Sequence, residues 1–284
     1  AGDAGGAASG ASAVGREGPC RLGGAASAVF AIGRESAYFR GRYVKFSRNM
    51  PQSPWVLDGE RKGEGSVEEC ICVPAARVFG AGACKFHAEG REDIDVRMLG
   101  AGRPFVIEVK NAQRLSPSCG ELEAAVNSAD GGQVQIRRLA RCSASDMAAL
   151  QKDAENHRKT YLAECWSQRP LVEADLAPLR SRRDVDVLQK TPVRVLHRRA
   201  PAVRPRTVHW LDPVLTDEHY FTLRLNVQAG TYIKEFVHGD LGRTRPSVRD
   251  LLGGGRVEIL QLDVEGVEDA NGTAEGAEPA GCAA

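Results

Sequence analysis

Hydrophobic and polar positions repeat with both helical and strand periods along the chain. Residues 66–79 place apolar side chains three and four positions apart, which predicts an amphipathic helix. The apolar residues expected on one side of this helix are Val67, Ile71, Ala75 and Val78. Residues 160–167 instead show the alternation of side chains that predicts a strand.

Similar patterns extend through most of the remaining chain. Further helices are expected over residues 121–129 and 143–157. The expected strands are a strand–turn–strand unit over 85–100, a strand over 103–113, a hairpin over 206–230 and a last strand over 256–267. Because the chain has no solenoid repeat and no regular βαβ alternation, the pattern favours an α+β fold. We expect a central mixed, mostly antiparallel sheet with flanking helices.

The two ends of the chain lack hydrophobic periodicity. Residues 1–29 begin with a stretch rich in Gly, Ala and Ser, and residues 267–284 are also small and polar. Such segments cannot bury enough apolar surface to fold, so we expect disorder in both. One folded domain over residues 30–266 is the predicted organisation. The first residue is alanine, which suggests a fragment or a processed start.

Charge adds a second pattern, because arginines cluster although the net charge is small. The formal net charge is +1 and the isoelectric point about 7.8, which by itself predicts no nucleic-acid partner. Clustered arginines can follow a phosphate backbone, although solvated surface charge is the commoner role of any single cluster. The clusters lie at residues 137–141, 180–183, 194–206 and 243–256.

Cysteine spacing does not match the common zinc or disulfide frameworks. The eight cysteines form no CxxC pair, and only one residue separates Cys70 from Cys72. The sequence has no secretory signal, so we expect reduced thiols in an intracellular protein. No apolar run reaches the length of a membrane span, and we expect no membrane partner.

Residues 90–111 contain a first candidate for catalysis. Gly90 permits a sharp turn that can expose Asp93, and Glu108 and Lys110 follow on an apolar strand. An aspartate followed by Glu-x-Lys is typical of metal-dependent nucleases, in which carboxylates hold Mg²⁺ and the lysine polarises the attacked group. Short strings of this kind are common, and taken by itself this one is better explained by alternating residues on a half-exposed strand.

Residues 228–247 contain the second candidate. A strand is expected to end at Gly230 and a short helix to begin at Thr231. Apolar residues at helical spacing then supply one buried face, which leaves Lys234 pointing elsewhere. The residues of that face are Ile233, Phe236, Val237 and Leu241. A lysine presented by so tightly bounded a turn indicates a functional role rather than packing.

Three short motifs resemble those of the pseudouridine synthases. GTYIKEF (residues 230–236) resembles a strand–turn–helix motif in which a cation follows Gly-Thr-Tyr-Ile, and GRED (residues 90–93) resembles the loop with the catalytic aspartate. KTYLAECW (residues 159–166) resembles the strand that supplies a tyrosine. Residues 41–267 as a whole are similar to the archaeal and eukaryotic tRNA pseudouridine synthase family that modifies T-loop uridines, at tRNA positions 54 and 55.

This resemblance implies a pseudouridine synthase fold with an RNA-binding cleft, and an isomerase activity. Asp93 matches the catalytic carboxylate, whereas Asp95 does not match the motif position and is expected to be structural. Substrate and product are isomers, so no cofactor and no metal is expected. The carboxylate can attack the sugar, attack the base or remove a sugar proton, and the sequence does not separate these routes.

The same resemblance makes Lys234 the partner of Asp93. A nearby cation favours the charged form of a carboxylate that loses solvent. Gly230 permits the turn, and Thr231 can cap the helix so that Lys234 points across the sheet toward Asp93.

Further residues are expected to contact the RNA. Tyr161 would stack on the flipped uracil and could help to move the C5 proton. Ile233 would wall the uracil pocket and Leu260 would face it, although core packing is an equally good account of Leu260. Leu262 is the alternative on the same strand. The arginines expected to contact phosphates are Arg91, Arg194, Arg198, Arg199, Arg204 and Arg206.

The expected partner is tRNA, bound through its T-arm, with other structured RNAs as further candidates and no obligatory protein partner. Family members carry an N-terminal accessory region with a zinc site, and no part of this sequence resembles it. We therefore expect the catalytic part of a longer protein, located in the nucleus, the cytoplasm or both. Two other functions stay open at this point: a metal-dependent nuclease that uses Asp93, Glu108 and Lys110, and an RNA-binding module without chemistry.

Overall fold

The computed structural model describes residues 33–114, 116–153, 157–197 and 199–268. The described residues from Arg34 onward form one compact unit, and Gly33 belongs to the segment before it. The segment 1–29, for which we expect disorder, lies outside the described residues, and so does the second such segment from residue 269 onward. The last strand extends to Val267, and the N–H of Glu268 donates to the carbonyl of Arg158, so these two residues belong to the folded part.

The first half of the compact unit alternates strands with three helices. Its strands are β1 (Ala37–Lys45), β2 (Trp55–Leu57), β3 (Glu60–Lys62), β4 (Ala83–Ala88), β5 (Arg97–Lys110) and β6 (Val134–Cys142). Its helices are α1 (Val67–Phe79), α2 (Cys119–Asn127), the 3-10 turn η1 (Asp130–Gly132) and α3 (Ala144–Asp153).

The second half contains longer antiparallel strands and short helices. Its strands are β7 (Lys159–Ser167), β8 (Arg183–Lys190), β9 (Val203–Asp217), β10 (Tyr220–Val227), β11 (Thr244–Arg245) and β12 (Val257–Val267). Its helices are α4 (Glu173–Arg180), α5 (Ile233–His238), α6 (Val248–Leu251) and the 3-10 turns η2 (Val193–Val195) and η3 (Asp240–Gly242).

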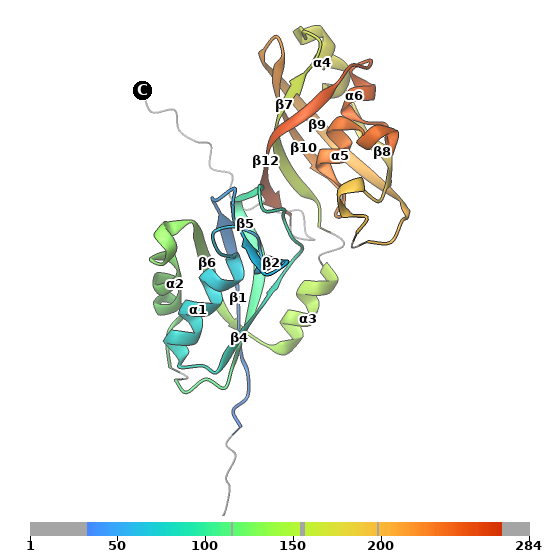
Figure 1. Ribbon diagram of the computed structural model, residues 1–284. Coiled ribbons are helices and arrows are strands. Elements are labelled where there is room, and N and C mark those ends of the chain that lie inside the picture. The colour runs from blue at the N-terminus through green and yellow to red at the C-terminus, as the bar shows by residue number, and fades with distance from the viewer. Residues whose placement is uncertain (1–32, 115, 154–156, 198, 269–284) are drawn as a thin grey trace, which may run out of the picture. The chain divides into compact units, whose positions relative to one another are not determined.

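One ten-stranded sheet connects both halves, in the order β11-β8-β9-β10-β7-β12-β5-β1-β6, with β4 also paired to β5. Neighbouring strands pair antiparallel, except for the short parallel contact that pairs Asp263 with Arg97 and Val264 with Met98. Figure 1 shows β12 between β7 and β5, at this junction. The predicted α+β class, with a mixed and mostly antiparallel sheet, is confirmed.

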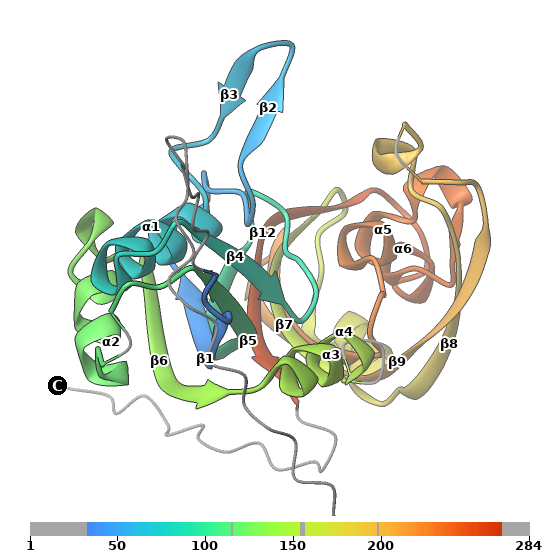
Figure 2. The same ribbon diagram turned by 90° about the horizontal axis from the view of Figure 1, so that it is seen from below.

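Helices cover both faces of the strands β1, β5 and β6. Phe39 on β1 contacts Phe79 on α1, with ring centroids 4.9 Å apart, and α1 packs beside α2. Figure 2 shows α3 on the other side of these strands from α1 and α2. Figure 2 also shows the separate two-stranded sheet β2–β3 extending away from the main sheet. The apolar residues between these layers belong to one buried core.

Helix α1 has the predicted position for identifiable local reasons. Ser66 accepts a hydrogen bond from the N–H of Glu69 and caps the first turn, and Gly80, with φ of 56°, ends the helix in the left-handed conformation. Three of the four residues expected on its buried side are buried, whereas Val78 is half-buried and Phe79 takes its place in the core.

The sequence predicts one strand that ends at residue 100 and a separate strand over residues 103–113. This prediction is wrong, because Arg97–Lys110 is one continuous strand. Gly100 and Gly102, with φ of 57° and 83°, lie within it. A Cβ atom on Gly100 would stand 1.8 Å from the carbonyl oxygen of Glu265 on β12. A Cβ atom on Gly102 would stand 2.7 Å from the carbonyl oxygen of Tyr43 on β1. The two glycines therefore mark close approaches of β5 to its neighbours β12 and β1, and not a turn between strands.

The helix of residues 228–247 also differs from expectation. Helix α5 ends at His238, and Leu241, expected on its buried face, lies in η3 with φ of 57° and is 91% exposed. Thr231 does not cap the helix, since its hydroxyl donates to the carbonyl of Gln228. The side chain of Gln189 instead bonds both the N–H and the carbonyl of Tyr232, which fixes the chain at the helix start.

Candidate active site

The loop between β4 and β5 holds Asp93, and buried cations fix its backbone. Gly90 has φ of 80°, which permits the turn. Lys45 is fully buried, and its ammonium donates to the carbonyls of Met50, Asp93 and Ile94 at 2.7, 3.1 and 3.2 Å. An ammonium has three donors, so these three carbonyls satisfy it completely.

A second cation ties the same loop to the last strand. The guanidinium of Arg48 donates to the carbonyl of Asp95 at 3.2 Å and to that of Leu262 at 3.0 Å. It also pairs with the carboxylate of Asp263 at 2.8 Å. The loop is therefore held against β12 as well as against β1.

Glu92 and Asp93 lie in opposite environments although they are adjacent. The carboxylate of Glu92 is buried and accepts hydrogen bonds from Arg103 and from the hydroxyl of Tyr43, both at 2.9 Å. The side chain of Asp93 is 33% exposed. A buried carboxylate is stable only with such partners, so the Glu92 cluster fixes the loop from inside and leaves Asp93 on the outside.

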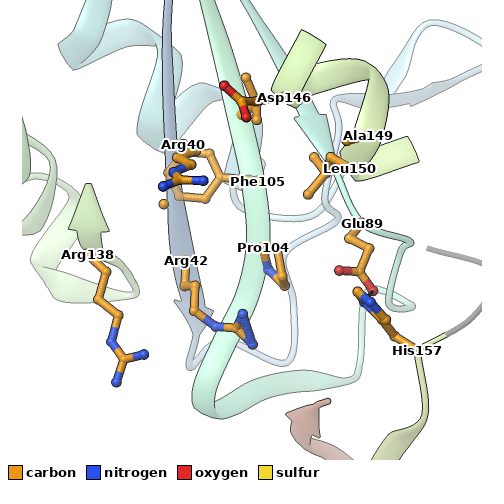
Figure 3. A pocket seen from close by; sticks show the side chains of 12 residues that line it. Arg40, Arg42, Glu89, Pro104, Phe105, Arg138, Asp146, Ala149, Leu150 and His157 are labelled. Atoms are coloured by element: carbon orange, nitrogen blue, oxygen red, sulfur yellow. Dashed lines mark ion pairs between the residues drawn. The ribbon is translucent and has the colours of Figure 1, made fainter. Parts of the chain in front are cut away.

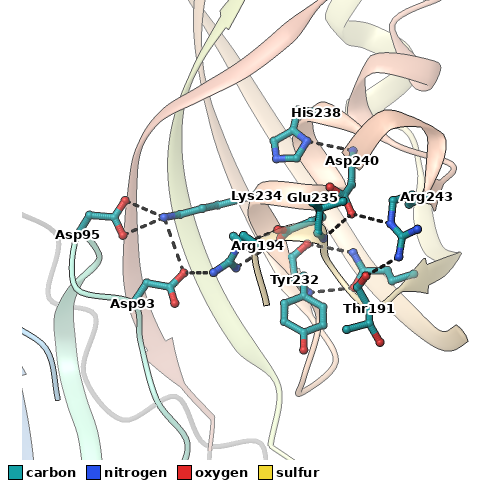
Figure 4. Close-up of polar contacts among 12 residues, drawn as sticks. Asp93, Asp95, Thr191, Arg194, Tyr232, Lys234, Glu235, His238, Asp240 and Arg243 are labelled. Atoms are coloured by element: carbon teal, nitrogen blue, oxygen red, sulfur yellow. Dashed lines mark hydrogen bonds and ion pairs between the residues drawn. The ribbon is translucent and has the colours of Figure 1, made fainter. Parts of the chain in front are cut away.

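Two cations meet at one oxygen of Asp93, as Figure 4 shows. The Nη1 atom of Arg194 lies 2.8 Å from Oδ2 of Asp93, and the Nζ atom of Lys234 lies 3.7 Å from the same oxygen. Residues from three distant segments of the chain are thereby brought together. The predicted proximity of Lys234 to Asp93 is present in the structure.

The shortest contacts of Lys234 are nevertheless made to a different carboxylate. Its Nζ atom lies 2.6 and 2.8 Å from the two oxygens of Asp95. Burial opposes the ionisation of Asp95, but the hydrogen bond and charge of Lys234 outweigh it, and the pKa of Asp95 is lowered. The expectation that Lys234 takes Asp93 as its main partner is corrected, because the ammonium bridges both carboxylates and bonds Asp95 more closely.

Arg194, expected to contact phosphates, instead binds two carboxylates of the protein. Besides Asp93 it contacts Glu235, with Nε at 2.7 Å from Oε1 and Nη2 at 3.5 Å from Oε2. Glu235 lies on α5 and is 1% exposed. Sequence reasoning missed Glu235, although a glutamate beside the buried apolar residues of a short helix is a signal for a paired buried charge.

Tyr161 lies on β7, half-buried in the sheet. Burial raises the pKa of its phenol, and the carboxylates of Glu92 and Asp93 raise it further against the opposing charge of Arg103. The phenol is therefore protonated at neutral pH and is close enough to sense the charge of Asp93.

The remaining predicted residues are found in different settings. Ile233 is 4% exposed and belongs to the core, at the first position of α5. Leu260 is 55% exposed at a bulge in β12, whereas its alternative Leu262 is 6% exposed and packs in the core. Arg91 and Arg199 are exposed, and Arg198 lies outside the described residues.

The residues of the nuclease alternative are not brought together. Asp93 precedes the start of β5, and Glu108 lies near the opposite end, roughly 35 Å further along an extended strand. Glu108 accepts from Ser36 at 2.9 Å and pairs with Lys110 at 3.3 Å, so its partners are local. Across the described ranges, no three His, Cys, Asp or Glu side chains are grouped as a metal site would require.

A cavity of about 350 Å³ lies elsewhere, beside α3. Figure 3 shows its lining, which includes Arg40, Phe105, Asp146 and the buried pair of Glu89 and His157. The Nδ1 atom of His157 lies 2.9 Å from the carboxylate of Glu89. None of the residues with an expected catalytic or RNA-binding role lines this cavity.

In the described part of the chain, no helix is both long and apolar enough for a membrane span.

Comparison with known proteins identifies the family. The family model described as "Pus10, C-terminal" matches residues 38–268. The human protein named tRNA pseudouridine synthase Pus10 is 44% identical over 236 residues, which cover 82% of this chain and 44% of the human one. The protein of that name from the archaeon Thermofilum pendens is 39% identical over 231 residues, covering 81% of this chain and 52% of its own length. The chain thus spans about half the length of these curated relatives, and it belongs to the Pus10 C-terminal family.

Proposed function

We propose that this chain is the catalytic domain of a tRNA pseudouridine synthase that converts uridine to pseudouridine in the T-loop. Its support is the family membership, the printed names of the relatives and a site that agrees with the chemistry. The observation that carries the proposal is the half-exposed carboxylate of Asp93, which has two cations within 4 Å. The loop that carries it is held by a hydrogen bond from buried Lys45 to the Asp93 carbonyl.

The reaction breaks the bond between C1′ of the ribose and N1 of uracil, turns the base and forms a bond from C1′ to C5. The proton on C5 is lost and N1 gains one, so substrate and product have the same composition. Asp93 would provide the carboxylate that attacks the nucleoside or removes a sugar proton. Its two cations stabilise the negative charge that this step requires.

Neighbouring residues support the handling of a flipped base. Tyr161 on β7 is near enough to Asp93 for the two charges to interact, and its ring can stack on the uracil. Its protonated phenol can give its own proton to the base as it takes the proton lost from C5, so the phenol is protonated before and after the step. Leu260 is exposed on β12, two residues before the carbonyl that Arg48 joins to the Asp93 loop, so it is free to contact the base. Arg91 and Arg199 are exposed cations that can contact the phosphates of the T-arm.

The test is pseudouridine formation on a tRNA transcript and on its isolated T-arm. Asp93→Asn keeps the shape of the side chain and removes the carboxylate, so we expect pseudouridine formation to be abolished while the thermal midpoint and RNA affinity stay near those of the unmodified chain. Asp95→Asn is the matched comparison, because it removes a neighbouring carboxylate and leaves that of Asp93 in place, so its turnover should fall far less than that of Asp93→Asn. Near-normal turnover of Asp93→Asn would exclude the catalytic assignment, and strand cleavage in the same assay would support a nuclease.

A further inference from the structure

We infer that Arg194 is a positioning residue for Asp93, that buried Glu235 holds it in place, and that together they present Oδ1 of Asp93 to the nucleoside. This inference rests on the proposed function. Arg194 is thereby given a role other than the phosphate contact that the sequence predicts for it, and Glu235 is given a role in the same site. The inference follows from the contacts at the two ends of one guanidinium, drawn in Figure 4.

Arg194 bridges two carboxylates with different atoms of its planar group. Nε and Nη2 face Glu235, at 2.7 and 3.5 Å, and Nη1 donates to Asp93 at 2.8 Å. A guanidinium is rigid and planar, so fixing one edge fixes the direction of its other N–H groups. The position of Glu235 therefore determines where the donor to Asp93 points.

Glu235 is a buried anchor for Arg194. It is 1% exposed, and its neighbours Ile233 and Phe236 on α5 belong to the core. A buried carboxylate is strongly unfavourable without a partner, so the ion pair with Arg194 is needed for α5 to pack as it does. The segment of Arg194 is itself attached, since Val195 is buried in η2 and the N–H of Val193 donates to Asp240 at 3.4 Å.

The two oxygens of Asp93 are consequently not equivalent. Both Arg194 and Lys234 contact Oδ2. In the described ranges of the chain, Oδ1 has neither a hydrogen bond nor an ion pair. Since binding at Oδ2 fixes the rotation of the carboxylate, the oxygen with unused lone pairs has one defined direction. That oxygen is the one available to the ribose or the base.

The experiment measures single-turnover rate at saturating T-arm RNA, RNA affinity and thermal midpoint for four variants: Arg194→Ala, Arg194→Lys, Glu235→Gln and the double variant Arg194→Ala/Glu235→Gln. We expect Arg194→Ala to slow the saturated rate roughly 10- to 100-fold, the effect of losing one charge-assisted hydrogen bond, with affinity changed less than about threefold. Arg194→Lys keeps the charge and should recover part of the rate. Glu235→Gln should also slow the saturated rate, although Glu235 is too deeply buried to touch RNA.

The double variant separates positioning from stability. Arg194→Ala leaves the buried Glu235 unpaired and should lower the thermal midpoint, and adding Glu235→Gln removes that charge and should raise the midpoint again. If Arg194 positions Asp93, the saturated rate stays low in the double variant. Recovery of the rate together with the midpoint would overturn the inference, because Arg194 would then have only a structural role.

A phosphate-binding role gives another result. Saturating RNA would then restore the rate of Arg194→Ala. The slope of the logarithm of RNA affinity against the logarithm of salt concentration would become shallower by about one unit. Either result would also overturn the inference. Arg199→Ala is the comparison for this behaviour, as an exposed arginine of the same segment. If the unmodified chain formed no pseudouridine, the proposed function would fail. If Asp93→Asn retained turnover, the catalytic assignment of Asp93 would fail. If Asp93→Asn were inactive while Arg194→Ala kept its full saturated rate, only this inference would fail.

Discussion

At the scale of single residues, the site is organised by how charges are shared. Five charged side chains form a connected cluster in which each cation contacts Asp93 and one further carboxylate: Asp93, Asp95, Glu235, Arg194 and Lys234. Because Lys234 divides its charge between two aspartates, its contribution to Asp93 alone is smaller than a simple pair would provide. Distance then ranks the cations, with Arg194 at 2.8 Å and Lys234 at 3.7 Å.

Lys234→Ala tests this ranking. We expect the single-turnover rate at saturating RNA to fall about tenfold, equivalent to about 1.4 kcal/mol, and to fall less than in Arg194→Ala. Lys234→Arg keeps the charge and should retain more of the rate. RNA affinity should change little, because the partners of Lys234 are carboxylates and not phosphates. A larger loss in Lys234→Ala than in Arg194→Ala would make the lysine the main cation of Asp93.

Tyr161 gives a prediction about pH. Burial raises the pKa of its phenol above the usual value of 10.0, so the phenol stays protonated through the neutral and mildly alkaline range. The saturated rate should therefore show no loss from phenol ionisation up to pH 9.5, measured by single turnover on T-arm RNA. Tyr161→Phe keeps the ring and removes the proton, so it should lower the rate more than the RNA affinity. A fall in rate near neutral pH that vanishes in Tyr161→Phe would contradict this account.

At the scale of elements, the loop between β4 and β5 depends on a lysine of β1. Lys45 is completely buried, and its three donors meet three carbonyls, two of which belong to the loop. Burial, together with the charge of Arg103, lowers the pKa of Lys45 to about 8, although the carboxylates of Glu92, Asp95 and Asp93 act in the opposite direction. At neutral pH the buried Lys45 is charged, and keeping this charge away from water lowers the free energy of unfolding.

Lys45→Met should change how the free energy of unfolding depends on pH. Between the folded pKa of about 8 and the value of 10.5 for an exposed lysine, the unfolded chain binds more protons than the folded one. The free energy of unfolding of the unmodified chain should therefore gain up to about 3 kcal/mol over this range, relative to Lys45→Met. Denaturant unfolding from pH 7 to pH 10 measures the difference. Lys85→Met, on an exposed position of β4, is the control, and a constant difference between chain and variant would refute the prediction.

At the scale of the whole molecule, β12 connects the two halves of the sheet. It pairs antiparallel with β7 and meets β5 in a short parallel contact. Arg97 bonds Asp263 across this junction at 2.9 Å, and Arg48 joins the same carboxylate at 2.8 Å. The strand that presents Leu260 and the loop that presents Asp93 are thus fixed to each other by one junction.

Gly100→Ala should break this junction. Its Cβ atom would lie 1.8 Å from the carbonyl oxygen of Glu265, so backbone must move. We expect a loss of at least about 2 kcal/mol in the free energy of unfolding, measured with urea, together with slower turnover. Gly131→Ala is the control, because Gly131 has a similar φ of 60° with no atom within 4 Å of an added Cβ. It should cost only the backbone strain, about 1 kcal/mol, and equal losses in the two variants would contradict the role of the crossing.

Local patterns were sufficient for most elements and for the position of the loop that carries Asp93. Helix α1 lies where its apolar spacing predicts, and β7 and the β9–β10 hairpin follow their residue patterns. The turn at Gly90 that exposes Asp93 was also predictable, since it needs only neighbouring residues. These features depend on interactions over a few positions, which a single sequence contains in full.

The tertiary structure alone decided which charges meet. Asp93 and Arg194 are 101 positions apart in the chain, and Lys234 and Asp95 are 139 apart, so no local pattern could pair them. The end of α5, in contrast, has a local cause, because Gly239 stops the helix in the left-handed conformation. The helical spacing of Leu241 wrongly outweighed that glycine in the prediction, and Leu241 is exposed in η3. The sequence by itself predicted a candidate site of one carboxylate with nearby cations. Packing of β1, α5 and η2 against one loop determined which cation bonds which oxygen, since charge pairing is set by distances that only the folded chain defines.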